Sequence, residues 1–114
     1  MKGVLLSASG EITEVFPANG KEFVLNELQR MVEGPIEVIQ LNRLEKDNVF
    51  HTKGMIDIRL SSAKTYLMVV NEEGKLTGKR FNPIATMIAL ATCSIKSDDW
   101  IVGDTIICLS EMIG

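Results

Sequence analysis

The residues whose types and spacing could bind a ligand lie just before and within the start of a predicted helix. Asn82 precedes Pro83, the order of an N-cap followed by a proline at the first helical position. The backbone N–H groups of Ala85 and Thr86 would then lie free at the start of that helix. Because a helix N-terminus carries a partial positive charge, we expect this end to attract an anion.

Basic and aromatic side chains complete the predicted site. Lys79 and Arg80 stand just before the helix, and a guanidinium can contact a phosphate through two hydrogen bonds. The rings that could stack on a planar ligand are Tyr66 and Trp100. The sequence therefore predicts a ligand-binding site made of Lys79, Arg80, Asn82, Ala85, Thr86, Tyr66 and Trp100.

Plainer interpretations of the same residues stay open. An N-cap such as Asn82 stabilises a helix by about 1 kcal/mol without any ligand, and cations in a loop are commonly solvated. A lone tryptophan beside Ile101 and Val102 can equally belong to a core or to an interface.

The other reactive side chains lack a catalytic spacing. Glu72 and Glu73 are adjacent in a predicted turn and would point apart, whereas a general acid and base flank a substrate. His51 has no histidine or cysteine near it in sequence, and Cys93 and Cys108 match no metal-ligand spacing. Nucleophile-elbow, Walker and dinucleotide-binding motifs are absent. We therefore predict that the protein is not an enzyme and uses no metal or cofactor.

Length and composition narrow the class of protein. A chain of 114 residues forms one domain that buries about two thirds of the surface of its unfolded form. The net charge of −3 and pI near 5.1 argue against nonspecific binding to nucleic acid polymers, which needs a basic surface. No run approaches the roughly 20 apolar residues that span a bilayer, and the first residues do not resemble a signal peptide. We expect a cytoplasmic single domain over residues 1–114, with no membrane contact and with both cysteines reduced in the core.

The elements that must position the site follow from hydrophobic periodicity. We expect a hairpin over 3–7 and 11–16, and further strands over 36–41, 66–70, 100–102 and 105–109. A helix over 24–33 would end at Gly34-Pro35 with a left-handed glycine, and a second helix would cover 83–92. The second helix is so apolar that we expect it to be nearly enclosed, by the sheet and by another subunit.

Two polar segments separate these elements. Residues 42–64 form a polar excursion that carries an edge strand or hairpin near 55–60, and Asn71–Gly74 is a turn in which both end residues are left-handed. The sequence as a whole predicts an α+β fold, with two helices packed on a mostly antiparallel sheet of about five or six strands. We also expect a homo-oligomer.

Four motifs, in this order, carry a resemblance to a known family. They are Gly34-x-Ile36-Glu37-Val38-Ile39, Val70-Asn71-Glu72-Glu73-Gly74-Lys75-Leu76, Asn82 with Ala85-Thr86, and Asp99-x-Ile101-Val102-Gly103-Asp104. Over most of residues 11 to 110 the chain resembles a small domain-of-unknown-function family of phages, plasmids and gut bacteria. Pro35 stands where that family often has an aromatic residue, and the 42–64 excursion is longer than expected there. The resemblance implies an origin in a phage or mobile element and implies no activity.

Two classes of function fit these observations. The first is a non-catalytic phage or mobile-element accessory protein of the bacterial host cytoplasm. It would sequester a small anionic, nucleotide-like ligand, such as a nucleotide immune signal, as a counter-defence. The second is a protein-binding inhibitor or adaptor that acts on a host factor through an exposed apolar strip or the 42–64 excursion. A ligand at 100 times its dissociation constant stabilises a fold by about 2.7 kcal/mol, so thermal melting separates the two classes.

Overall fold

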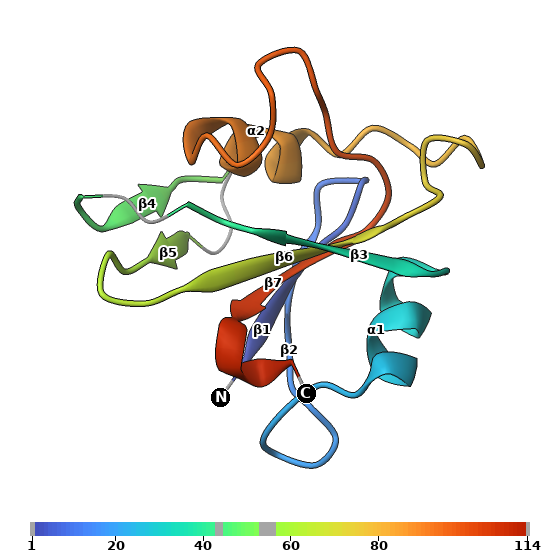
Figure 1. The fold of residues 1–114 in the computed structure, drawn as a ribbon, viewed down its shortest axis with the longest axis horizontal. Coiled ribbons are helices and arrows are strands. Elements are labelled where there is room, and N and C mark those ends of the chain that lie inside the picture. The colour runs from blue at the N-terminus through green and yellow to red at the C-terminus, as the bar shows by residue number, and fades with distance from the viewer. Residues whose placement is uncertain (1, 43–44, 53–56, 114) are drawn as a thin grey trace.

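A five-stranded antiparallel sheet with one helix on each face forms the body of the protein (Figure 1). The computed structural model describes residues 2–42, 45–52 and 57–113. In spatial order, the strands are β2 (Ile12–Val15), β1 (Gly3–Leu6), β7 (Thr105–Leu109), β6 (Tyr66–Asn71) and β3 (Ile36–Gln40). The helices are α1 (Leu25–Val32) and α2 (Pro83–Ala91), and a 3-10 turn, η1 (Ser110–Met112), follows β7. The predicted α+β fold is confirmed.

The alternation of side chains along the strands builds two cores, one under each helix. On β6, Met68 and Val70 pack with Ile88 and other residues of α2, whereas Val69 packs with Leu28 of α1. β6 lies between β3 and β7, so both of its edges are paired, and α2 and α1 cover its two faces. This position explains why its sequence is a continuous apolar run, as predicted for a central strand.

The 42–64 excursion carries a small hairpin outside the main sheet. β4 (Asn48–Phe50) and β5 (Ile58–Leu60) pair antiparallel with each other and turn Phe50, Ile58 and Leu60 into the core on the α2 side. The predicted hairpin is confirmed for these residues. Residues 43–44 and 53–56, which include part of the predicted 55–60 strand, lie outside the described residues.

The end of α1 differs from the prediction in one residue. Glu33, with φ of 63°, takes the left-handed conformation that was expected for Gly34. Glycine is required at position 34 for another reason, since a Cβ there would lie 2.6 Å from Nδ2 of Asn71. The prediction of left-handed Asn71 and Gly74 is also wrong, because Asn71 is the last residue of β6 and neither residue has a positive φ.

Within one chain α2 is covered on one side: Ala85 and Ile88 are buried, but Met87 and Leu90 are exposed on its outer side, so its enclosure by another subunit stays a prediction. One further expectation needs correction. Residues 100–102 do not form a strand of the sheet, although Val102 makes an isolated bridge with Phe81. Within the residues that the structure describes, no helix is both long and apolar enough to cross a bilayer.

Candidate functional site

The start of α2 is closed by Asn82, which is fully buried. Its side-chain oxygen accepts a hydrogen bond from Ala85 N (3.1 Å), and its backbone carbonyl accepts one from Thr86 N (3.0 Å). Its Nδ2 donates to the carbonyl oxygens of Leu6 (3.0 Å) and Gly103 (2.8 Å). Asn82 is therefore the predicted N-cap, followed by proline at the helix start, and it also joins α2 to β1 and to the turn before β7.

The expectation that the first amides of α2 are free for a ligand is wrong. Both Ala85 and Thr86 are buried, and their N–H groups bond to Asn82. The Thr86 hydroxyl is used as well, since it accepts from Ile101 N (2.9 Å) and donates to Ile101 O (3.3 Å). These groups hold the protein together, and none of them faces solvent with an unused hydrogen bond.

The remaining predicted site residues lie in three different places. Lys79 Nζ pairs with Glu33 Oε1 at 3.1 Å, and Arg80 is exposed. Tyr66 begins β6, about 17 Å along the strand from Asn71, and its hydroxyl accepts a hydrogen bond from Ser61 N (3.0 Å). Only Trp100 lines a cleft near the end of β6 where the strand leads into the charged loop.

This cleft, which we call the Trp100 cleft, has a volume of about 690 Å³. Strands β3 and β6 contribute one side of it through Glu37, Ile39 and Val70. The loop after β6 and the segment between α2 and β7 contribute the rest, with residues 72, 75–76, 93–96 and 99–102. The cleft is thus assembled from segments far apart in the sequence.

Asp99 and Lys75 hold Trp100 in place beside the cleft. Asp99 Oδ1 accepts a hydrogen bond from Trp100 N (2.8 Å) and forms an ion pair with Lys75. Lys75 Nζ also lies 4.1 Å from the centroid of the Trp100 ring, a cation–π contact. The hydrogen bond from Lys75, followed by that from Trp100 N, holds the pKa of Asp99 below its usual value. Sequence reasoning missed Lys75 and Asp99, because 24 positions separate them and no local pattern links them.

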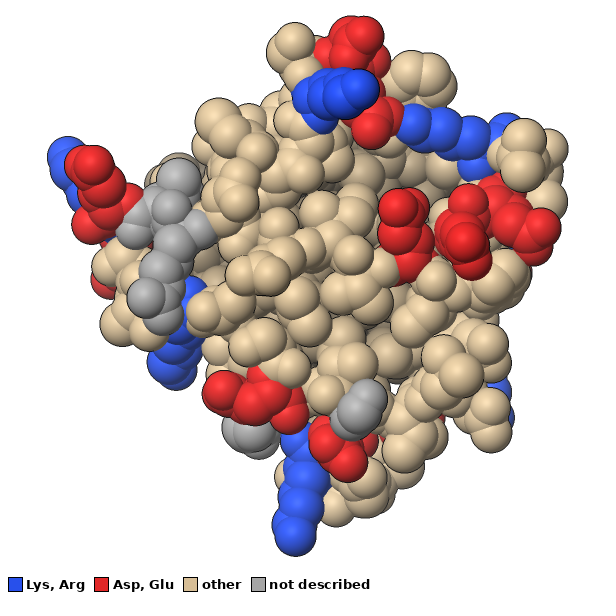
Figure 2. All heavy atoms as spheres, viewed as in Figure 1, with Lys and Arg blue, Asp and Glu red and all other residues tan. Residues whose placement is uncertain are grey.

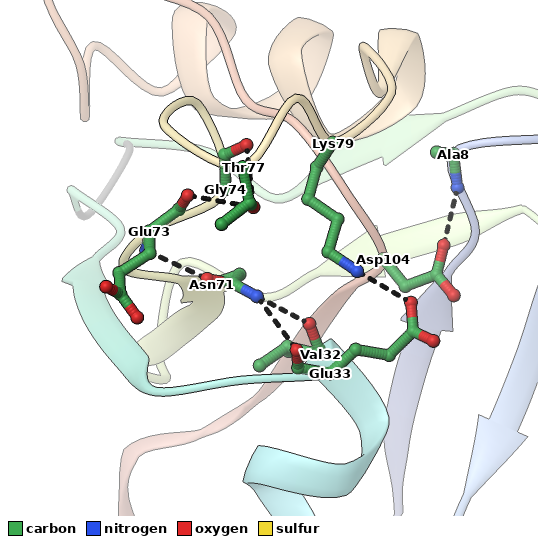
Figure 3. A network of polar contacts seen from close by, with 9 residues as sticks. All are labelled: Ala8, Val32, Glu33, Asn71, Glu73, Gly74, Thr77, Lys79 and Asp104. Atoms are coloured by element: carbon green, nitrogen blue, oxygen red, sulfur yellow. Dashed lines mark hydrogen bonds and ion pairs between the residues drawn. The ribbon is translucent and has the colours of Figure 1, made fainter.

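A second buried asparagine fixes the loop that carries Lys75 (Figure 3). Asn71 Nδ2 donates to the carbonyls of Val32 (3.0 Å) and Glu33 (3.2 Å), at the end of α1. Its Oδ1 accepts from Glu73 N (2.8 Å), and the Thr77 hydroxyl donates to Glu73 O (3.0 Å). The loop after β6 is therefore bonded to α1 as well as to itself.

Charges of both signs surround the Trp100 cleft. Its carboxylates are Glu37, Glu72 and Asp99, and its ammonium groups are Lys75 and Lys96. Asp99 forms an ion pair with Lys75. Lys96 forms no ion pair among the described residues, although its charge also helps to lower the pKa of Asp99.

The other reactive side chains stand apart from one another. Glu72 and Glu73 are exposed, and His51 is exposed beside Asp57 at 3.2 Å. In the described ranges, no group of three or more His, Cys, Asp or Glu side chains is placed to hold a metal ion. Both cysteines are free thiols. Cys108 is buried, and this burial raises its pKa to about 11. Cys93 is exposed and lines the cleft, so its predicted core position is wrong.

Comparison with known proteins found no match. No family model matches this chain, and the searches of curated proteins and of solved structures gave none. The resemblance to the phage and plasmid family, and the origin that it implies, therefore stay predictions.

Proposed function

We propose that the protein is a non-catalytic binding protein that holds a small anionic, nucleotide-like molecule in the Trp100 cleft. The observation that carries this proposal is the Trp100 ring, which is 45% exposed at the cleft, has Lys75 over it and follows a backbone N–H that Asp99 holds. The site differs from the one predicted at the start of α2, but the proposed class of ligand is the same.

A fixed aromatic ring favours a planar ligand. A base stacked on an aromatic side chain contributes about 1–3 kcal/mol to binding. The backbone of Trp100 is held by Asp99, and the cation–π contact with Lys75 restricts the ring, so less side-chain freedom is lost when a ligand stacks on it.

The charges suggest an orientation for such a ligand. Lys96 lines the cleft without an ion pair among the described residues, which makes it the group best suited to a phosphate. Glu37 and Glu72 repel phosphate but accept hydrogen bonds from amino groups. We therefore place the phosphate toward Lys96 and the edge of the base toward the two glutamates. This arrangement favours a ligand with few phosphate charges over a triphosphate.

The lining supports binding rather than catalysis. Among its described residues it has carboxylates, ammonium groups and the Cys93 thiol, but no histidine that could act as a base for that thiol. A protein that binds without reacting lowers the free concentration of its ligand. Such sequestration would suit a phage or mobile-element accessory protein that counters a nucleotide immune signal.

The single tryptophan of the chain makes the proposal directly measurable. Because Trp100 is the only indole, its fluorescence reports on the cleft alone. We expect a nucleoside monophosphate or a cyclic dinucleotide to quench this emission and to raise the melting temperature. At the same concentrations, inorganic phosphate should do neither.

Matched lysine variants locate the site. Lys96→Ala should weaken nucleotide binding about tenfold, the loss of roughly 1.4 kcal/mol of a charge-assisted contact. Lys21→Ala, which removes an exposed lysine outside the cleft lining, should bind as the wild type does. Arg80→Ala tests the original prediction at the helix start, and it should also leave binding unchanged. Loss of binding in Arg80→Ala but not in Lys96→Ala would contradict the cleft assignment.

A protein partner is the second candidate, favoured by apolar side chains that reach into solvent. Leu76, at the cleft, is 87% exposed, and Phe81, just before α2, is 51% exposed. An inhibitor or adaptor that docks through them on a host factor would show no quenching and no stabilisation by any nucleotide.

A further inference from the structure

The outer edge of β3 carries backbone groups that no strand in the described part of the chain uses. On its inner side, Leu41 N donates to Tyr66 O (3.0 Å) and Glu72 N donates to Pro35 O (2.8 Å). Since residues of an antiparallel strand alternate in direction, positions 35, 37, 39 and 41 bond to β6. The N–H and C=O groups of Ile36, Val38 and Gln40 therefore point away from the sheet.

This edge has few of the devices that usually protect a sheet edge, and Glu37 is its one exposed charged residue. The pairing of β3 with β6 is continuous, without a bulge, and no lysine or proline lies within the strand. Val38, at its centre, is 42% exposed. The opposite edge, β2, is shorter by one residue and carries Glu14, which forms an ion pair with Lys2. β3 is thus the edge that can accept another strand.

The surface around β3 is also suited to contact. In Figure 1, β3 crosses in front of the other strands and no segment is drawn in front of it. Figure 2 shows the same face with its Lys, Arg, Asp and Glu side chains around the rim and none in the middle. An uncharged centre within a charged rim is the usual anatomy of a protein interface.

We propose that β3 pairs antiparallel with β3 of a second copy of this chain, about a two-fold axis at Val38. In this register Val38 faces Val38 of the partner subunit, and Ile36 faces Gln40 of the partner subunit. All the outward N–H and C=O groups of Ile36, Val38 and Gln40 then find partners. The two five-stranded sheets become one continuous sheet.

The side chains favour this register over its neighbours. It places Glu37 opposite Ile39 of the partner subunit, so no like charges lie directly opposite each other. An axis at Glu37 would put Glu37 directly opposite Glu37 of the partner subunit, which is destabilising, and would leave Gln40 unpaired. An axis at Ile39 would leave the groups of Ile36 unpaired.

The pairing would bring the two Trp100 clefts together. Glu37 and Ile39 line the cleft, and both lie on the strand that the two copies share. Ile39 of the partner subunit would therefore lie beside Glu37 at the boundary between two clefts. The pairing itself rests on the strand edge and stands independently of any ligand.

A charge exchange at Val38 tests both the interface and its register. Sedimentation equilibrium without ligand should give the wild type a mass twice that of the 12.6 kDa chain. Val38→Lys and Val38→Glu should each halve that mass, because two like charges would face each other across the axis. An equimolar mixture of the two variants should restore the doubled mass, because opposite charges would then meet.

A second exposed valine supplies the control. Val49→Lys changes a 38% exposed valine on β4, away from the proposed interface, and should leave the mass doubled. All three variants should keep a cooperative melting transition, since neither valine is buried.

Several outcomes would overturn the proposal. A wild type that stays monomeric across the concentration range would do so, even if its β3 instead binds a strand of another protein. A Val38→Lys variant that stays dimeric would do so as well, and so would a mixture of the two Val38 variants that stays monomeric. Nucleotide quenching measured on monomeric Val38→Lys would show separately whether the Trp100 cleft binds its ligand.

Discussion

The start of α2 and the Trp100 cleft lie close together in sequence but use their polar groups in opposite ways. At the start of α2, Asn82 is fully buried and bonds to the helix, to β1 and to the turn before β7. At the cleft, Lys75 and Asp99 also bond to each other, but they do so beside a half-exposed ring and an open volume of about 690 Å³.

The contrast teaches that a helix start is a binding site only when its amides lack a partner inside the protein. The Asn-Pro pair that predicted α2 also supplied the cap that closes it. The open cleft lies instead where two loops meet a sheet edge, and most of its polar groups come from those loops.

The largest expected effect comes from removing the cap. Asn82→Ala should lower the free energy of unfolding by about 3–4 kcal/mol. It deletes the cap of Ala85 N and leaves the buried carbonyls of Leu6 and Gly103 without the donor that Asn82 supplies. Urea denaturation followed by circular dichroism measures this loss.

Asn19 is the matched control for that measurement. Its side chain also bonds to the backbone, since its oxygen accepts from Lys21 N and Glu22 N, but Asn19 is exposed. Asn19→Ala should therefore cost about 1 kcal/mol or less. Equal losses in the two variants would mean that the start of α2 is open to water, contrary to the structure.

The second expected effect is at Asn71, which joins the end of α1 to the loop of Lys75. Asn71→Ala should cost about 2–3 kcal/mol, because three hydrogen bonds at a nearly buried position lose their partner. It should also weaken nucleotide quenching of Trp100, since Lys75 lies on the loop that Asn71 fixes. Asn71→Asp keeps the acceptor for Glu73 N but loses both donors, so it should not restore stability. An Asn71→Ala variant with unchanged ligand affinity would show that the loop fixed by Asn71 does not contribute to ligand binding.

Much of the fold could be predicted because its signals are local. The 3.6-residue periodicity of α1, the Asn-Pro start of α2 and the apolar run of β6 each lie within one element. The left-handed residue after α1 could not be placed, because a glycine after a helix usually marks that conformation. Gly34 is required instead by the approach of Asn71, which lies 37 positions further along the chain.

The site could be predicted only in part for the same reason. Residue type predicts Trp100 as a candidate and charge predicts Lys79 and Arg80, but no local pattern shows that Lys79 pairs with Glu33. The ion pair of Lys75 with Asp99 depends on the fold bringing two loops together. Thr86 was predicted as a donor to a ligand, whereas burial commits its hydroxyl to Ile101.

The smallest expected effect concerns the Lys75–Asp99 pair. Both side chains are more than one third exposed, so a double-mutant cycle with Lys75→Met and Asp99→Asn should give a coupling energy of about 0.2–1 kcal/mol. The Lys2–Glu14 pair at the β2 edge has similar exposure and should give a similar coupling. Only the Lys75–Asp99 pair should alter Trp100 emission.

The pH dependence of this pair has a defined sign. The pKa of Asp99 is lower in the folded protein than its ordinary value of 3.8, first because of Lys75 and then because of Trp100 N. Its contribution to stability is therefore fully present above that value and is lost as the pH falls through the lowered folded pKa. Trp100 emission should change in the same acid range, because protonation of Asp99 releases Lys75 from the carboxylate beside the ring. Asp99→Asn should abolish this change in emission, whereas the control Glu14→Gln should keep it. If the acid transition of Trp100 emission persists in Asp99→Asn, another group positions the ring.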